Sequence, residues 1–81
     1  MSATILWQPD VPNHGRNLEV GAPSSFLEMM AEAFGRGPWT LDRSSLEIIR
    51  GLLIASQDRC AWTELKKAIE DHGQIRVWAE Y

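Results

Sequence analysis

With 81 residues, of which 44% are hydrophobic and 23% charged, the chain has the composition of one ordinary globular domain rather than of a disordered or fibrous protein. Its net charge of −3 gives no general attraction to phosphate backbones or anionic lipids, so a nucleic-acid contact would need a local basic patch. The longest apolar run, residues 52–55, is too short to span a membrane, and a single cysteine excludes an internal disulfide. Since no secretory signal is present either, we expect a single cytoplasmic domain over residues 1–81, without membrane contact.

The first part of the chain predicts one strand, a loop and the option of a second strand. Residues 3–8 are rich in strand formers and stop at Pro9, which cannot donate a hydrogen bond to a sheet. Residues 9–16 hold two prolines and a glycine and are expected to form a loop. Leu18 and Val20 alternate with polar residues, so a second strand that forms a hairpin with the first is an open alternative.

A first helix is predicted to begin at Ser25, because Ser25 and Glu28 have the spacing of a capping box. Apolar side chains then recur at intervals of three and four, at Phe26, Leu27, Met30, Ala31 and Phe34. Glycines and Pro38 end this helix, and residues 39–41 are expected to form a short apolar link to the next one.

A second helix is predicted over residues 44–57, with Thr40, Asp42 and Ser44 as competing N-caps and a capping box between Ser44 and Glu47. Its apolar arc covers about half of the circumference, which is typical of a central helix with neighbours on two sides. Gly51 lies inside it, and the close approach of another backbone would explain a glycine there.

A third helix over residues 61–72 is cleanly amphipathic, is capped by Gly73 and leads directly into a strand over residues 74–81. The facing sides of the second and third helices predict the centre of the core: Leu46, Ile49, Leu53, Leu65 and Ile69. The order β(β)αααβ predicts an α+β fold in which three helices pack on one face of a small two- or three-stranded sheet. The N- and C-terminal strands are expected to be adjacent in that sheet.

No motif predicts catalysis, a cofactor or a metal. His14, Cys60 and His72 lack the spacing of a zinc site, and neither histidine belongs to a diagnostic catalytic arrangement. Carboxylates stand singly, and those of the third helix alternate with lysines on its solvated face. Residues 35–38 follow a helix rather than a strand and include a proline, so they do not resemble a phosphate-binding loop. We therefore expect a protein that is not an enzyme and has no small-molecule cofactor.

Four tryptophans are many for this length, and each suits either a core or a recognition surface. Trp39 and Trp62 are expected in the core. In the last strand, alternation places Arg76, Trp78 and Glu80 opposite the apolar residues that face the helices. These three residues form the predicted partner-binding surface. The alternative is that Trp78 pairs across the sheet with Trp7 or Leu6.

These features favour a small acidic binding protein that acts through protein–protein contacts, either as a homodimer or as an accessory or inhibitory subunit. Compact acidic proteins of this kind are often encoded by phages and mobile elements. The alternative is a winged helix-turn-helix module over residues 44–81 that binds nucleic acid. Its contact residues would be Arg59, Thr63, Lys66, Lys67 and Arg76. Three acidic residues share the exposed face of the third helix and make nucleic acid the less favoured partner.

Overall fold

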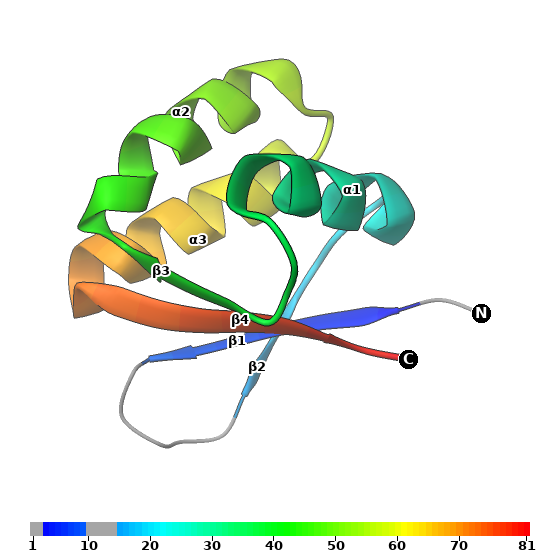
Figure 1. Cartoon of the computed structure of the whole chain (residues 1–81), viewed down its shortest axis with the longest axis horizontal. Helices are drawn as coiled ribbons and strands as arrows, with labels where there is room; N and C mark the ends of the chain where they lie inside the picture. Colours follow the sequence, from blue (N-terminus) through cyan, green and yellow to red (C-terminus); the bar gives the residue numbers. More distant parts are fainter. Residues whose placement is uncertain (1–2, 10–14) are drawn as a thin grey trace.

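The computed structural model describes residues 3–9 and 15–81, in which three helices cover one face of a four-stranded antiparallel sheet (Figure 1). The strands are β1 (Thr4–Pro9), β2 (Arg16–Leu18), β3 (Trp39–Asp42) and β4 (Gln74–Glu80). The helices are α1 (Pro23–Phe34), α2 (Leu46–Ala55) and α3 (Arg59–His72), with a short 3-10 turn, η1 (Arg43–Ser45), before α2. The strand order is β2-β1-β4-β3, so the predicted α+β class and the predicted contact between the first and last strands are confirmed.

The hairpin that the sequence left open is present, because β1 pairs with β2 from Ile5 opposite Leu18 to Trp7 opposite Arg16. The second strand lies over residues 16–18, slightly before the alternation at Leu18 and Val20. Most of the loop predicted between the two strands, including His14, lies outside the described residues.

The sheet has four strands, where two or three were predicted. Residues 39–41 were expected to link two helices, but Trp39–Asp42 forms β3, which pairs with β4 from Trp39 opposite Val77 to Asp42 opposite Gln74. Trp39 and Leu41 are buried while Thr40 and Asp42 are exposed, as in a strand with one face against a core. The expected link is therefore an edge strand.

Both predicted capping boxes are wrong. Helix α1 begins at Pro23, where the fixed φ of proline favours a first helical turn, and no side chain caps its N-terminus. Of the three competing N-caps, Asp42 is the one used, and it caps η1 directly before α2: its carboxylate accepts the Ser44 N–H at 2.9 Å, and its own N–H donates to Ser45 Oγ at 3.4 Å. The Ser44 hydroxyl and N–H lower the pKa of the Asp42 carboxyl below its ordinary value of 3.8.

The helix next to the sheet is α3, and α2 packs on α3 in an outer position (Figure 1). Ile49, Leu65 and Ile69 are fully buried, as predicted, whereas Leu46 and Leu53 only border the core. Ile48 is 44% exposed and Ile54 is 77% exposed, so α2 is not the central helix that its broad apolar arc indicated. No atom approaches the position that a Cβ on Gly51 would take, and the proposed close backbone contact there is absent from the described part of the chain.

The predicted core roles of Trp39 and Trp62 are confirmed. Trp62 is fully buried and stacks on Phe26 with ring centroids 4.4 Å apart. Trp39 is buried, and its indole N–H donates to the Gly35 carbonyl at 2.8 Å. That hydrogen bond ties the start of β3 to the C-terminal end of α1 and shapes the segment between them.

Candidate partner-binding site

The face of the sheet that points away from the helices carries the predicted recognition residues together. In β4, Ile75 and Val77 are fully buried under the helices, so the alternating residues Arg76, Trp78 and Glu80 point to the opposite face. On that face Arg76 lies between Gln8 of β1 and Thr40 of β3, its cross-strand partners. We call this surface the open face of the sheet.

Trp78 is partly buried on the open face. It lies directly opposite Leu6 of β1, and two carbons of its six-membered ring lie 2.8 Å from where a Cβ on Gly15 would stand. Its indole N–H donates to Glu80 Oε1 at 3.4 Å. The structure therefore shows the predicted pairing with Leu6, while Trp7 lies on the helix side of the sheet. Trp78 forms one wall of a surface hollow and does not stand alone in solvent.

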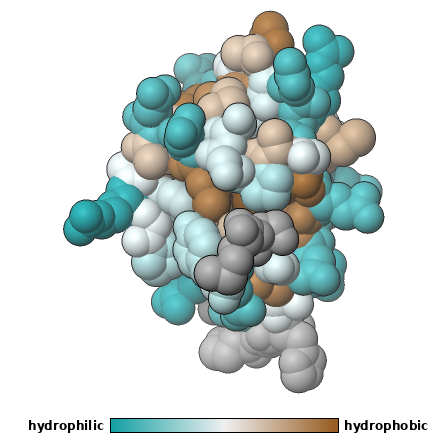
Figure 2. Space-filling view, turned by 90° about the vertical axis from the view of Figure 1, so that its right-hand side faces the viewer, coloured by the Kyte–Doolittle hydropathy of each residue, from teal (hydrophilic) through white to brown (hydrophobic). Residues whose placement is uncertain are grey.

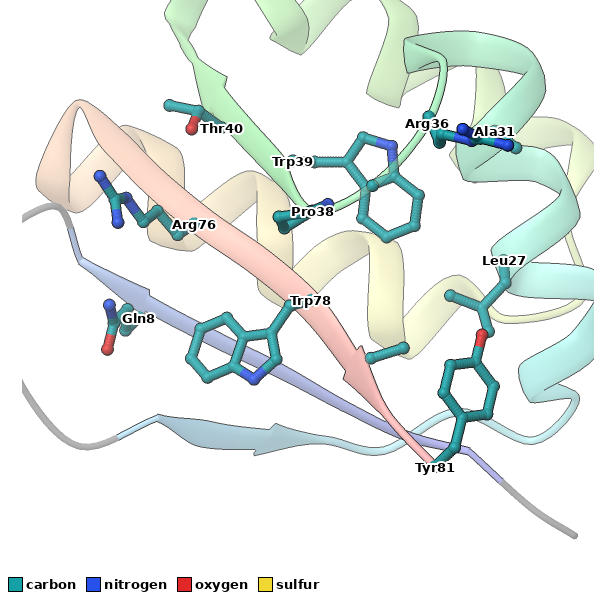
Figure 3. Close-up of a pocket in the computed structure, with 12 residues that line it drawn as sticks. Gln8, Leu27, Ala31, Arg36, Pro38, Trp39, Thr40, Arg76, Trp78 and Tyr81 are labelled. Atoms are coloured by element: carbon teal, nitrogen blue, oxygen red, sulfur yellow. The ribbon is translucent and has the colours of Figure 1, made fainter.

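This hollow, the β4 pocket, has a volume of about 790 Å3 and lies at the side of β4 next to the start of β3 (Figure 3). Its wall is largely apolar: α1 contributes Leu27 and Ala31, the segment before β3 contributes Pro38, and β3 contributes Trp39. The end of the chain contributes Trp78, Ala79 and Tyr81. Hydrophobic residues also reach the surface between hydrophilic ones on the side of the molecule that carries α1 and the C-terminal end of β4 (Figure 2).

The pocket exists because β3 is shorter than β4. β3 covers the edge of β4 only from Gln74 to Val77. Continuing the same register would place Pro38 opposite Trp78, but proline has no N–H to donate, and the chain turns away towards α1 (Figure 3). Within residues 3–9 and 15–81, the edge of β4 from Trp78 to Glu80 therefore has no partner strand on this side.

Two arginines are the charged side chains among the described residues of the pocket wall. Arg36 comes from the segment after α1 and Arg76 from the open face of β4, and no aspartate or glutamate is among the described residues that line the pocket. Neither guanidinium has an ion pair or hydrogen bond to another described residue. Among the described residues, the one ion pair joins Lys66 to Glu70. In a chain with a net charge of −3, two arginines that pair with no other described residue thus lie at one apolar hollow.

A second, smaller hollow of about 380 Å3 lies between β1 and α3. Its side chains already bind one another: the Arg16 guanidinium lies 5.1 Å from the centroid of the Trp7 ring, and the Trp7 indole donates to Glu64 at 2.6 Å. The His72 ring lies 6.1 Å from that of Trp7. These contacts give Trp7, Arg16, Glu64 and His72 a structural role in the packing of β1 against α3.

The residues of the nucleic-acid alternative do not share one surface. Arg59, Thr63 and Lys67 are exposed along α3, while Lys66 pairs with Glu70 at 3.3 Å. Arg76 lies on the open face, whereas α3 packs on the other face of the sheet. A protein that binds in a groove of nucleic acid needs its positively charged side chains on one surface, whereas here they lie on opposite sides of the sheet.

Of the three residues that the sequence predicted as a partner-binding surface, Arg76 and Trp78 line the β4 pocket and Glu80 does not. The pocket also contains Arg36, Leu27 and Tyr81, which the sequence did not single out as site residues. One sequence signal could have predicted β3: the Gly37-Pro38 pair lies directly before residues 39–42, in which apolar and polar side chains alternate.

Comparisons with protein-family models, with curated proteins and with solved structures gave no match. In the part of the chain that the structure describes, no three histidine, cysteine or acidic side chains gather closely enough to hold a metal ion. Nor does any helix of that part have the length and apolar character required to cross a bilayer.

Proposed function

We propose that this chain is a non-catalytic binding protein, acting as an accessory or inhibitory subunit, that recognises another protein through the β4 pocket. The observation that carries the proposal is the edge of β4 from Trp78 to Glu80, which no described strand covers, beside an apolar hollow with two arginines that pair with no described residue.

Each of these features favours protein recognition. Aromatic and arginine side chains are the residues most enriched at the energetic centres of protein interfaces. An unpaired strand edge offers backbone donors and acceptors that a partner chain can satisfy. A pocket with an apolar wall and few polar groups gives both burial and orientation. Arg36 and Arg76 give the pocket a local positive charge in a chain whose net charge is −3.

The outer helix α2 is the competing surface. Ile48 and Ile54 are exposed there, but they lie singly on a helix, and neither lines a described pocket. Isolated exposed apolar residues are normal on protein surfaces. The β4 pocket is therefore the better supported site.

Site-specific photo-cross-linking in the source cells tests the proposal. A benzophenone amino acid replaces Tyr81, which is 86% exposed at the pocket, or Ile54, which is 77% exposed on α2. We expect a discrete protein adduct from position 81 that is absent from position 54. An adduct at position 54 alone would assign recognition to α2, and adducts to nucleic acid would favour the winged-helix alternative.

A further inference from the structure

Resting on the proposed function, we infer that the β4 pocket binds a short extended peptide segment of the partner, which adds as a strand to the edge of β4 from Trp78 to Glu80. The segment places an apolar side chain opposite Ala79 and a neighbouring carboxylate beside Arg76.

The first argument is that the pocket surrounds the strand edge from both faces of the sheet. Ala79 lies on the helix side, as do Leu27 and Trp39, and the Tyr81 ring points towards Leu27 (Figure 3). Arg76 and Trp78 lie on the open face. Side chains of an added strand alternate between the two faces, so a strand fills a hollow of this shape, whereas a helix lying on one face does not.

The position of β3 limits the length and register of the segment. β3 occupies the edge of β4 up to Val77, so an added strand begins or ends beside Trp78. Its residue opposite Ala79 points to the helix side, where the wall is apolar. This residue is therefore a large apolar one, because a small side chain would leave that space unfilled.

The charges select the flanking residues. A residue opposite Trp78 lies on the open face, diagonal to both Arg76 and Glu80. A carboxylate there reaches the Arg76 guanidinium, which pairs with no other described residue, while the Glu80 carboxylate accepts the Trp78 indole N–H at 3.4 Å. Arg36 adds a second positive charge to the pocket. A residue opposite Glu80 meets a carboxylate and is therefore not acidic.

A second copy of the chain is a poorer occupant of the same edge. Two β4 edges paired around this position would set Ala79 opposite Ala79, and the methyl groups would leave most of the apolar space empty. The acidic and apolar segment therefore belongs to a different protein.

The probes are fluorescein-labelled, terminally blocked pentapeptides with a central Phe. A Glu precedes or follows the Phe, and matched peptides carry Lys in place of Glu or Ser in place of Phe. We expect the Glu peptides in one order to bind at least about tenfold more tightly than their Lys counterparts, as a charge-assisted contact implies. Arg76→Glu should reverse this preference, and Arg59→Glu, on α3, should leave it unchanged. Circular dichroism establishes that both variants are folded.

Backbone measurements separate strand addition from simple occupation of the pocket. In amide NMR spectra, peptide should shift the Trp78, Ala79 and Glu80 amides that point away from β1 and slow their hydrogen exchange. Methylating each peptide nitrogen in turn should abolish binding at alternate positions, because alternate amides of a strand face its neighbour. Binding without these two effects overturns the inference, as does a concentration-dependent shift of the same amides without peptide, which would indicate a second copy.

The two proposals fail separately. If no peptide binds while the Tyr81 cross-link to a protein persists, the peptide inference is wrong and the proposed function stands. If the Tyr81 cross-link is absent as well, both are wrong.

Discussion

The indole N–H of Trp7 donates a hydrogen bond of 2.6 Å to the carboxylate of Glu64, which joins the first strand to the last helix. Trp7 is buried on the helix side of the sheet, and the Arg16 guanidinium lies against the same ring. Glu64 therefore helps to hold β1 against α3. The amphipathic pattern of the helix alone predicts a solvated residue at this position.

Glu64→Ala should lower the free energy of unfolding by about 1 kcal/mol, because it removes the acceptor of a partly buried hydrogen bond. Glu64→Gln keeps an oxygen acceptor at the same place and should cost less. Chemical denaturation of the two variants measures the difference. Equal stability of wild type and Glu64→Ala would show that water replaces the contact without loss.

Two glycines should respond in opposite directions to alanine. Gly51 lies in α2 with open space around its Cβ position, so Gly51→Ala should stabilise the fold by up to about 1 kcal/mol. Gly73 has a φ of 82° and ends α3, so Gly73→Ala should destabilise it by about 1 kcal/mol. Thermal unfolding of both variants provides the comparison. A destabilised Gly51→Ala would mean that the exposed face of α2 is packed against something.

The Asp42 cap predicts a dependence on acid pH. Hydrogen bonds from Ser44 lower the pKa of Asp42 in the folded state below 3.8, so its stabilising contribution is complete above the unfolded value. This stabilising contribution is lost as the pH falls through the lower pKa that Asp42 has in the folded state. Asp42→Ala should therefore be less stable than wild type near neutral pH, and the gap should narrow below pH 3.8. Ser44→Ala should reproduce part of this behaviour. A gap that stays constant with pH would exclude the cap as its cause.

The elements with strong periodicity were predictable from the sequence, and those set by a neighbour were not. Amphipathic α3, its Gly73 cap and the alternation of β4 depend on local patterns, and the structure has all three. The pairing of β3 with β4 depends on a strand far along the chain, and four residues are too few for a periodic signal. The outer position of α2 is likewise a tertiary outcome, since its apolar arc alone favours a central helix.

The same distinction applies to the candidate site. The alternation of side chains along a β-strand is enough to place Arg76 and Trp78 on one face of the sheet, so this part of the site could be predicted from the sequence. The pocket also needs Arg36, Leu27 and the early end of β3, which come together only when α1 and β4 are placed side by side. The packing of Gly15 on the Trp78 ring is another contact of this kind.

The chain should not bind duplex DNA appreciably at physiological salt. Its net charge is −3, Lys66 is paired with Glu70, and Arg76 lies across the sheet from the α3 cations. Fluorescence anisotropy with labelled duplex measures this. Submicromolar binding that weakens steeply with salt and disappears in Lys66→Glu would contradict the proposed function in favour of the winged-helix alternative.

The central claim is that a partner protein binds at the β4 pocket, and charge reversal tests it most directly. Affinity for the partner identified by the Tyr81 cross-link is measured by calorimetry for Arg76→Glu, at the pocket, and for Arg59→Glu, on α3. Both substitutions change the net charge equally. We predict a loss of at least about tenfold for Arg76→Glu and little change for Arg59→Glu. Equal losses, or a larger loss for Arg59→Glu, would contradict recognition at the β4 pocket.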